Sequence, residues 1–252
     1  MRLALHAEWT KMRTVAGPLW LVLGTVAATV ALGAGATAVV NCTADGCGGD
    51  TTKLTLMGVY LGQALVAILA VLIISGEYSS GMIRTTLTAV PRRAAVFTAK
   101  AVTLTGVVAV GGTAAVLGSL LAGRLILPDL GARALSLSNE PTLRAVFGTV
   151  LYLILIGLLS LGVATAVRDS AASIGVVLGV LYIIPIVSQT ISDPHWQRLL
   201  EKITPMSAGL AIQATTDLDS LPISPWAGLG VTAGWAAAAL LTGGLLLRSR
   251  DA

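Results

Sequence analysis

Six stretches of this 252-residue chain contain no Asp, Glu, Lys or Arg, and each is long enough to cross a bilayer as a helix. They are Thr14–Ala44, Leu54–Gly76, Ala101–Gly123, Ala145–Val167, Ser170–Ser192 and Ser220–Leu247. A hydrocarbon core of about 30 Å needs about 20 helical residues, and a charge in mid-span costs several kcal/mol. The chain is also only 11% charged, against about 25% in soluble domains. The sequence therefore predicts an all-α membrane protein with six transmembrane helices.

We expect one transmembrane domain covering residues 1–252, with spans at about 18–40, 54–75, 94–122, 142–167, 170–191 and 226–247. Only Arg168 and Asp169 separate the fourth and fifth spans, which predicts a tight hairpin. Pro185 is expected to kink the fifth span. Lys100 lies near one end of the third span, where its long side chain is expected to reach water.

Three G-x-x-x-G pairs are weak indications of close helix contacts, because a chain with 28 glycines contains such pairs by chance. They are Gly58–Gly62, Gly175–Gly179 and Gly230–Gly234.

The distribution of Lys and Arg between the spans predicts the orientation. With the N-terminus inside, ten of these residues are cytoplasmic and six are external, so the positive-inside rule favours both termini in the cytoplasm. The net charge of +4 then reflects membrane orientation and gives no reason to expect nucleic acid as a partner. A cleaved signal peptide ending near Ala36-Thr37-Ala38 is the alternative, although the polar lead that precedes it is long and contains Glu8.

Residues 1–17 predict an amphipathic helix. Leu5, Trp9, Met12 and Ala16 repeat at helical spacing among polar residues. Such a helix is expected to lie in the inner headgroup region and to be anchored there by Trp9. The alternative is that it simply extends the first span inward.

Two external segments carry further expectations. The loop before the second span holds the only cysteines, Cys42 and Cys47, which either form a small disulfide loop on the oxidising side or remain free thiols. Residues 192–225 are apolar for an external connection, with Trp196 and Leu199 on one helical face. This composition favours one or two short re-entrant-like helices in the outer leaflet.

Several catalytic and coupling motifs are missing from the sequence. It has no G-x-x-x-x-G-K-[ST] phosphate loop and no H-E-x-x-H, and its two histidines are expected on opposite sides of the membrane. We therefore expect neither an ATP site nor a metal site in this chain, and no enzymatic activity of its own. The spans also lack carboxylates in mid-membrane, which disfavours ion-coupled transport. The polar residues Gln63, Tyr152 and Gln189 are the candidates for a substrate path.

The most informative connection lies between the second and third spans. From Glu77 to Val90, the spacing predicts a short helix at the inner surface, with Glu77 and Arg84 on its polar side. Pro91 ends it, and Arg92 and Arg93 are placed to contact anionic headgroups. The alternative is a solvated loop that carries positive-inside arginines.

This connection, Gly76-Glu77-Tyr78-Ser79-Ser80-Gly81-Met82-Ile83-Arg84-Thr85-Thr86-Leu87 through Pro91-Arg92-Arg93 to Lys100, resembles the coupling helix of ABC-2-type exporter permeases. The N-terminal helix, the six spans, the apolar connection before the last span and the ending Leu247-Arg248-Ser249-Arg250-Asp251 are also similar to that family. The Cys42/Cys47 loop is not a feature of it.

The resemblance implies a multi-pass subunit of a bacterial cell membrane, paired with a second permease chain and with a cytoplasmic ATPase that binds ATP and Mg. Its coupling helix, at residues 77–91, would touch the ATPase. The contact residues implied are Glu77, Tyr78, Gly81, Met82 and Arg84, while Arg92 and Arg93 would hold the helix against the inner leaflet.

The expected function is therefore export of an amphipathic or hydrophobic substrate, such as a drug, antibiotic, lipid or peptide. Two alternatives remain open: a non-transporting membrane sensor or assembly partner, and an ion-coupled carrier.

Overall fold

A computed structural model describes residues 2–39, 49–79, 81–82, 93–127 and 135–249, and these residues form helices and no strand. Six of the helical stretches are long and apolar enough to cross a membrane, which confirms the predicted number of spans. They are Ala16–Ala38, Thr51–Tyr78, Arg93–Ile126, Glu140–Val167, Ser170–Thr190 and Pro225–Leu247. Cys42, Cys47, Arg84 and Arg92 lie outside the described residues.

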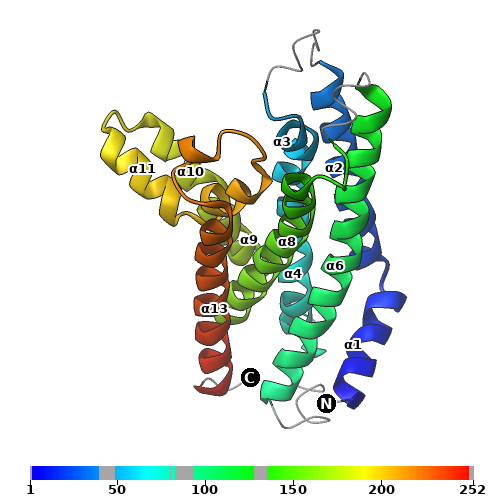
Figure 1. Ribbon diagram of the computed structural model, residues 1–252. Coiled ribbons are helices and arrows are strands. Elements are labelled where there is room, and N and C mark those ends of the chain that lie inside the picture. Colours follow the sequence, from blue (N-terminus) through cyan, green and yellow to red (C-terminus); the bar gives the residue numbers. More distant parts are fainter. Residues whose placement is uncertain (1, 40–48, 80, 83–92, 128–134, 250–252) are drawn as a thin grey trace.

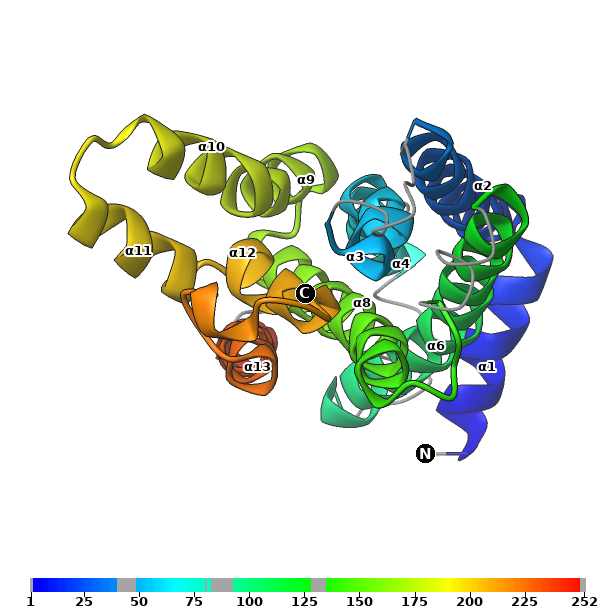
Figure 2. The same ribbon diagram turned by 45° about the horizontal axis from the view of Figure 1, so that its top comes forward.

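The long helices form a bundle around α8 (Glu140–Val167), which packs against α4 (Val59–Ser79), α6 (Arg93–Ile126) and α13 (Pro225–Ser249). The helix α2 (Ala16–Ala38) covers α4 and α6 from the other side (Figures 1 and 2). The starts of α1 and α6 and the ends of α4 and α13 lie at one end of the bundle, which we call the basal end (Figure 1).

The N-terminal helix α1 (Arg2–Thr14) is separate from the first span. Val15 is extended, with φ −91° and ψ 123°, before α2 begins. α1 lies alongside the basal part of α6 (Figure 1). It therefore does not continue the first span inward.

The second span is irregular at its start and regular at its end. It begins with α3 (Thr51–Thr55) and the 3-10 turn η1 (Leu56–Gly58), and α4 then continues to Ser79. Glu77 and Tyr78 consequently belong to the last turns of α4, which places them on the helix of the second span. Residues 83–92, most of the predicted coupling helix, lie outside the described part of the chain.

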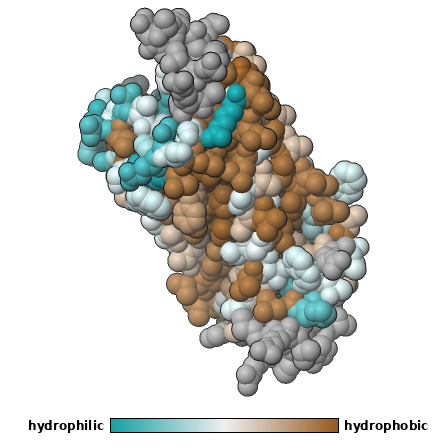
Figure 3. Space-filling view, turned by 45° about the vertical axis from the view of Figure 1, so that its right-hand side comes forward, coloured by the Kyte–Doolittle hydropathy of each residue, from teal (hydrophilic) through white to brown (hydrophobic). Residues whose placement is uncertain are grey.

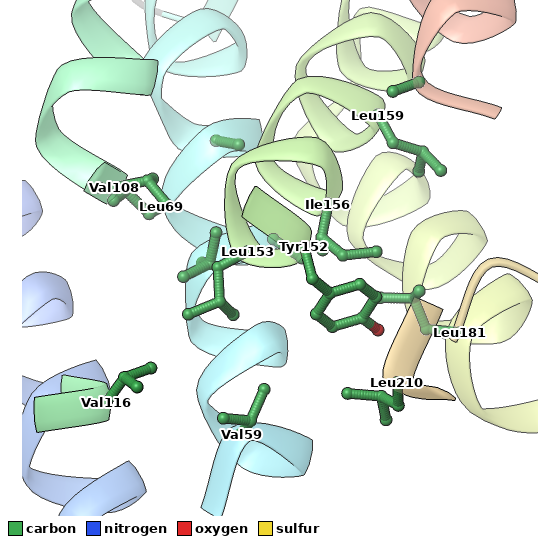
Figure 4. Packing of buried hydrophobic residues seen from close by; sticks show 14 of the residues in the cluster. Val59, Leu69, Val108, Val116, Tyr152, Leu153, Ile156, Leu159, Leu181 and Leu210 are labelled. Atoms are coloured by element: carbon green, nitrogen blue, oxygen red, sulfur yellow. The ribbon is translucent and has the colours of Figure 1, made fainter. Parts of the chain in front are cut away.

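The core of the bundle is apolar and centred on α8. Figure 4 shows Tyr152, Leu153 and Ile156 of α8 among residues from the neighbouring helices. On the outside, hydrophobic residues cover the length of the bundle and hydrophilic ones gather toward its ends (Figure 3). This is the arrangement expected of a chain whose sides face lipid.

The hairpin between the fourth and fifth spans is as tight as the sequence predicts. Arg168 adopts a left-handed conformation with φ 65° and ends α8, and the Asp169 carboxylate caps α9 (Ser170–Leu178) by accepting from Ala172 N at 2.7 Å. Beyond α9, a π-helical turn η2 (Gly179–Ile183) precedes α10 (Ile184–Thr190), near whose start Pro185 lies. The irregularity of the fifth span thus begins before the proline.

The segment before the last span forms α11 (Pro194–Ile203), α12 (Pro205–Leu210) and the 3-10 turns η3 (Ala211–Gln213) and η4 (Leu218–Ser220). α11 extends away from the bundle next to α10 (Figure 2), with Trp196 exposed. By contrast, α12 and η3 pack against α8 and α13. A Cβ at Gly209 would lie 2.4 Å from the Tyr152 ring, so only glycine permits this approach.

One of the three G-x-x-x-G pairs makes a close interhelical contact on both of its glycines. A Cβ at Gly58 would lie 1.9 Å from the carbonyl oxygen of Thr29 on α2, and one at Gly62 would lie 2.4 Å from the Thr29 hydroxyl. A Cβ at Gly175, Gly230 or Gly234 would meet no neighbouring atom among the described residues. One at Gly179 would meet only the Ile183 side chain of its own span.

Candidate functional site

Four charged side chains form a closed ring at the basal end. Glu8 and Lys11 come from α1, Glu77 from the end of α4, and Lys100 from the basal part of α6. Lys100 Nζ lies 2.9 Å from Glu8 Oε2 and 2.6 Å from Glu77 Oε1, and Lys11 Nζ lies 3.3 Å from Glu8 Oε1 and 2.6 Å from Glu77 Oε1. Each carboxylate therefore touches both ammonium groups, and the charge ring has no net charge.

The charge ring is almost completely buried. The side chain of Lys100 is 0% exposed, those of Glu8 and Glu77 are also buried, and only Lys11, at 34%, has substantial contact with solvent. Burying each ion costs several kcal/mol of desolvation free energy. The ion pairs of the ring compensate for this cost only while every charge has a partner of opposite sign. A third hydrogen bond of Lys100, to the Ile73 carbonyl at 3.4 Å, helps to satisfy its ammonium group.

Helical spacing explains how α1 contributes two members. Glu8 and Lys11 are three residues apart and so lie on the same side of α1. The pKa of Lys11 is raised above its ordinary value of 10.5: burial lowers it, but the hydrogen bond and charge of Glu77 and those of Glu8 together raise it by more. The ammonium form of Lys11 is therefore favoured in the folded chain.

The charge ring corrects one expectation and adds three residues that sequence reasoning missed, Glu8, Lys11 and Lys100. Lys100 does not reach water, because two carboxylates meet it inside the protein. For two of them a signal was present in the sequence: Glu8 is the only acidic residue before Asp45, and Lys100 is the only charge between Arg93 and Arg124.

The remaining residues predicted to contact a partner follow directly after Glu77. Tyr78 is half-buried, and the guanidinium carbon of Arg168 lies 5.5 Å from the centre of its ring. This geometry is that of a cation–π interaction. Gly81 has φ 68° and is exposed, as is Met82. The end of α4 thus contacts α1, α6 and the turn between α8 and α9, and the exposed residues Gly81 and Met82 follow it.

The residues predicted to anchor the inner side have different surroundings. Trp9 is half-exposed on α1. Arg93 is half-buried and donates from Nη1 to the Leu247 carbonyl at 2.9 Å, so it connects the start of α6 with the end of α13. A headgroup contact of Arg93 would have to share the guanidinium with this bond.

Two of the three candidates for a substrate path meet inside the bundle. The Tyr152 hydroxyl donates to Gln63 Oε1, and both side chains are fully buried. Gln63 Nε2 has no hydrogen-bond partner among the described residues. Nearby, the Tyr182 hydroxyl donates to the Tyr60 carbonyl. Gln189 is exposed on α10 and has no part in these bonds.

Comparisons with known proteins do not identify the chain. A scan against protein-family models and a search of curated proteins each found no match. Among the described residues, no group of three or more His, Cys, Asp or Glu side chains is placed to hold a metal ion.

Proposed function

We propose that this chain is the membrane-spanning permease subunit of an ATP-driven exporter, and that a separate cytoplasmic ATPase docks at the basal end. The observation that carries the proposal is the charge ring at the end of α4. It joins the helix that leads into the predicted coupling segment to α1 and α6 through buried ion pairs. A force applied to residues 77–92 would therefore reach three helices at once.

The contact residues have different roles in this proposal. Gly81 and Met82 are exposed beside the proposed docking segment, and Arg84 follows them in the sequence. Glu77 points into the charge ring, so we assign it to positioning the end of α4. Tyr78 packs on Arg168 and extends the connection to the fourth and fifth spans.

The substrate class and the second permease chain belong to the same proposal. The buried polar group in mid-bundle is neutral, consisting of Gln63 and Tyr152, which suits an amphipathic or hydrophobic substrate better than an ion. The first, fifth and sixth spans have only 17%, 22% and 22% of their apolar window buried, against 44–56% in the others. These spans leave large faces for lipid and for a second permease chain.

The proposal is tested by purifying the tagged chain with its ATPase from native membranes. Arg84→Glu is expected to remove the co-purified ATPase or its stimulation, because it reverses a charge in the proposed contact. The matched control is Arg198→Glu, an exposed charge reversal on α11 at the opposite end. If no ATPase accompanies the unaltered chain, or if both variants retain it equally, the proposal is wrong.

An ion-coupled carrier is the second candidate, and the charge ring itself favours it, since buried ionisable groups in transporters often carry protons. The position of the ring at the end of α4 and in the basal part of α6 argues against this role, because the four charges are paired with one another and lie far from mid-span. Uptake into vesicles that is driven by a pH gradient without ATP would establish the carrier.

A further inference from the structure

A cavity of about 350 Å³ lies beside the charge ring, between α1, α2 and α4. Its walls are mostly apolar and include Leu21, Leu69, Leu72 and Ile73. Its polar end is formed by charge-ring residues, among them Glu77. The cavity therefore combines a hydrocarbon-like body with one charged end, which is the pattern of a site for an amphiphile.

Glu77, which lines the polar end, carries an unused acceptor. Glu77 Oε1 binds both lysines, whereas Glu77 Oε2 is buried and has no hydrogen-bond partner among the described residues. The Glu77 side chain is only 7% exposed. A buried carboxylate oxygen without a donor is unfavourable, so a ligand that supplies a donor at this point gains free energy.

The neutrality of the charge ring selects the kind of donor. Two carboxylates and two ammonium groups already balance. An additional ammonium would introduce an unpaired buried charge, and a phosphate or carboxylate would meet Glu8 and Glu77 at short range. A hydroxyl group donates a hydrogen bond without adding charge.

The exposed lining residues indicate where the ligand comes from. Val15 and Leu72 line the cavity and are exposed, and the adjoining turns of α2 carry the exposed Leu19 and Trp20. This surface is apolar, and in a protein with six spans lipid chains cover such a surface. The bilayer is thus the reservoir of the ligand.

We propose that this cavity binds one neutral, hydroxyl-bearing alkyl amphiphile, with its chain against Leu21, Leu69 and Leu72 and its hydroxyl donating to Glu77 Oε2. A long-chain alcohol or a monoacylglycerol has this chemistry. The proposal concerns the chain by itself and does not depend on an ATPase partner.

The test uses the purified chain in lipid nanodiscs and a 1-dodecanol probe that carries a photoreactive diazirine in its chain. Labelling is expected to saturate at one probe per chain and to map to the walls of the cavity. Unlabelled 1-dodecanol should compete at least about tenfold better than dodecyl methyl ether, which has the same chain without the donor. Dodecylamine should compete more weakly than the alcohol.

Two variants localise the site without disturbing the charge ring. Leu72→Trp places a larger side chain in the lining of the cavity and is expected to weaken labelling about tenfold or more. Leu117→Trp is the matched control, because Leu117 on α6 has nearly the same exposure, 40% against 42%, and does not line the cavity. Equal competition by alcohol and ether, tighter binding of the amine, non-saturable labelling, or equal loss in both variants would each overturn the proposal.

Discussion

The two ends of the bundle hold distant segments together with different chemistry. At the basal end, α1, α4 and α6 meet through four charges that bind one another, three of them buried. At the opposite end, the Asp50 carboxylate accepts from Lys53 N at 3.0 Å, from the Thr215 hydroxyl at 2.7 Å and from Thr216 N at 3.2 Å. That bond set joins the start of α3 to the segment after η3, and its donors are neutral.

Two arginines at the opposite end also bind neutral groups. Arg124 donates to the Leu135 carbonyl and Arg144 to the Ala214 carbonyl. Backbone groups keep their polarity whatever happens to neighbouring side chains, so each of these contacts is independent. The charge ring differs, because removing one of its buried members leaves a net charge inside the protein, whereas solvent partly screens Lys11. The buried members at the basal end should therefore respond to single changes as a unit, and the opposite end only locally.

The largest effect is expected from Lys100→Met, which leaves two buried carboxylates facing one ammonium group. Breaking a buried ion pair from one side costs about 3–5 kcal/mol. The free energy of unfolding, measured by SDS titration in mixed micelles, should fall by that amount. Adding Glu8→Gln to Lys100→Met should recover most of the loss, because Glu77 and Lys11 then balance. A single variant as stable as the wild type would contradict a buried ring.

A smaller effect is expected from Asp50→Ala at the opposite end. The change removes a cap of α3 and the acceptor for Thr215 and Thr216, which is worth about 2 kcal/mol. Asp50→Asn should lose about half as much or less, since asparagine also caps helices and accepts hydrogen bonds. The same titration measures both variants. If Asp50→Asn is as damaging as Lys100→Met, the two ends do not differ in the way proposed.

The six spans could be predicted from sequence because the penalty for a charge in lipid acts on each segment separately. The charge ring could not, because a lysine near the end of a span can reach water or find a partner, and the choice depends on other helices. The partner of Lys100 on α1, Glu8, is 92 residues away. Helical periodicity considers only residues close in sequence, so it could not predict that Glu77 forms ion pairs with Lys11 and Lys100.

The glycine pairs show the same limit. Gly58–Gly62 and Gly230–Gly234 have the same spacing, yet only the first pair receives a neighbouring helix, at Thr29. The motif states where a close approach is permitted. Whether another helix occupies that place depends on the packing of the whole bundle.

The smallest expected effect is a difference between the two ends in how the free energy of unfolding depends on pH. The pKa of Lys11 is raised in the folded chain above 10.5, so its contribution to stability is fully present below about pH 10.5 and is lost as the pH rises through the folded pKa. The difference in unfolding free energy between wild type and Lys11→Met should therefore shrink toward zero at alkaline pH. This difference should be small even at pH 8, because the Lys11 side chain is one-third exposed and partly screened by solvent.

The control is the difference between wild type and Asp50→Ala, which should stay constant over the same pH range, since the Asp50 donors are backbone N–H groups and a hydroxyl. If the Lys11→Met difference instead persists unchanged to the highest pH at which the chain stays folded, its ammonium group is not what closes the ring.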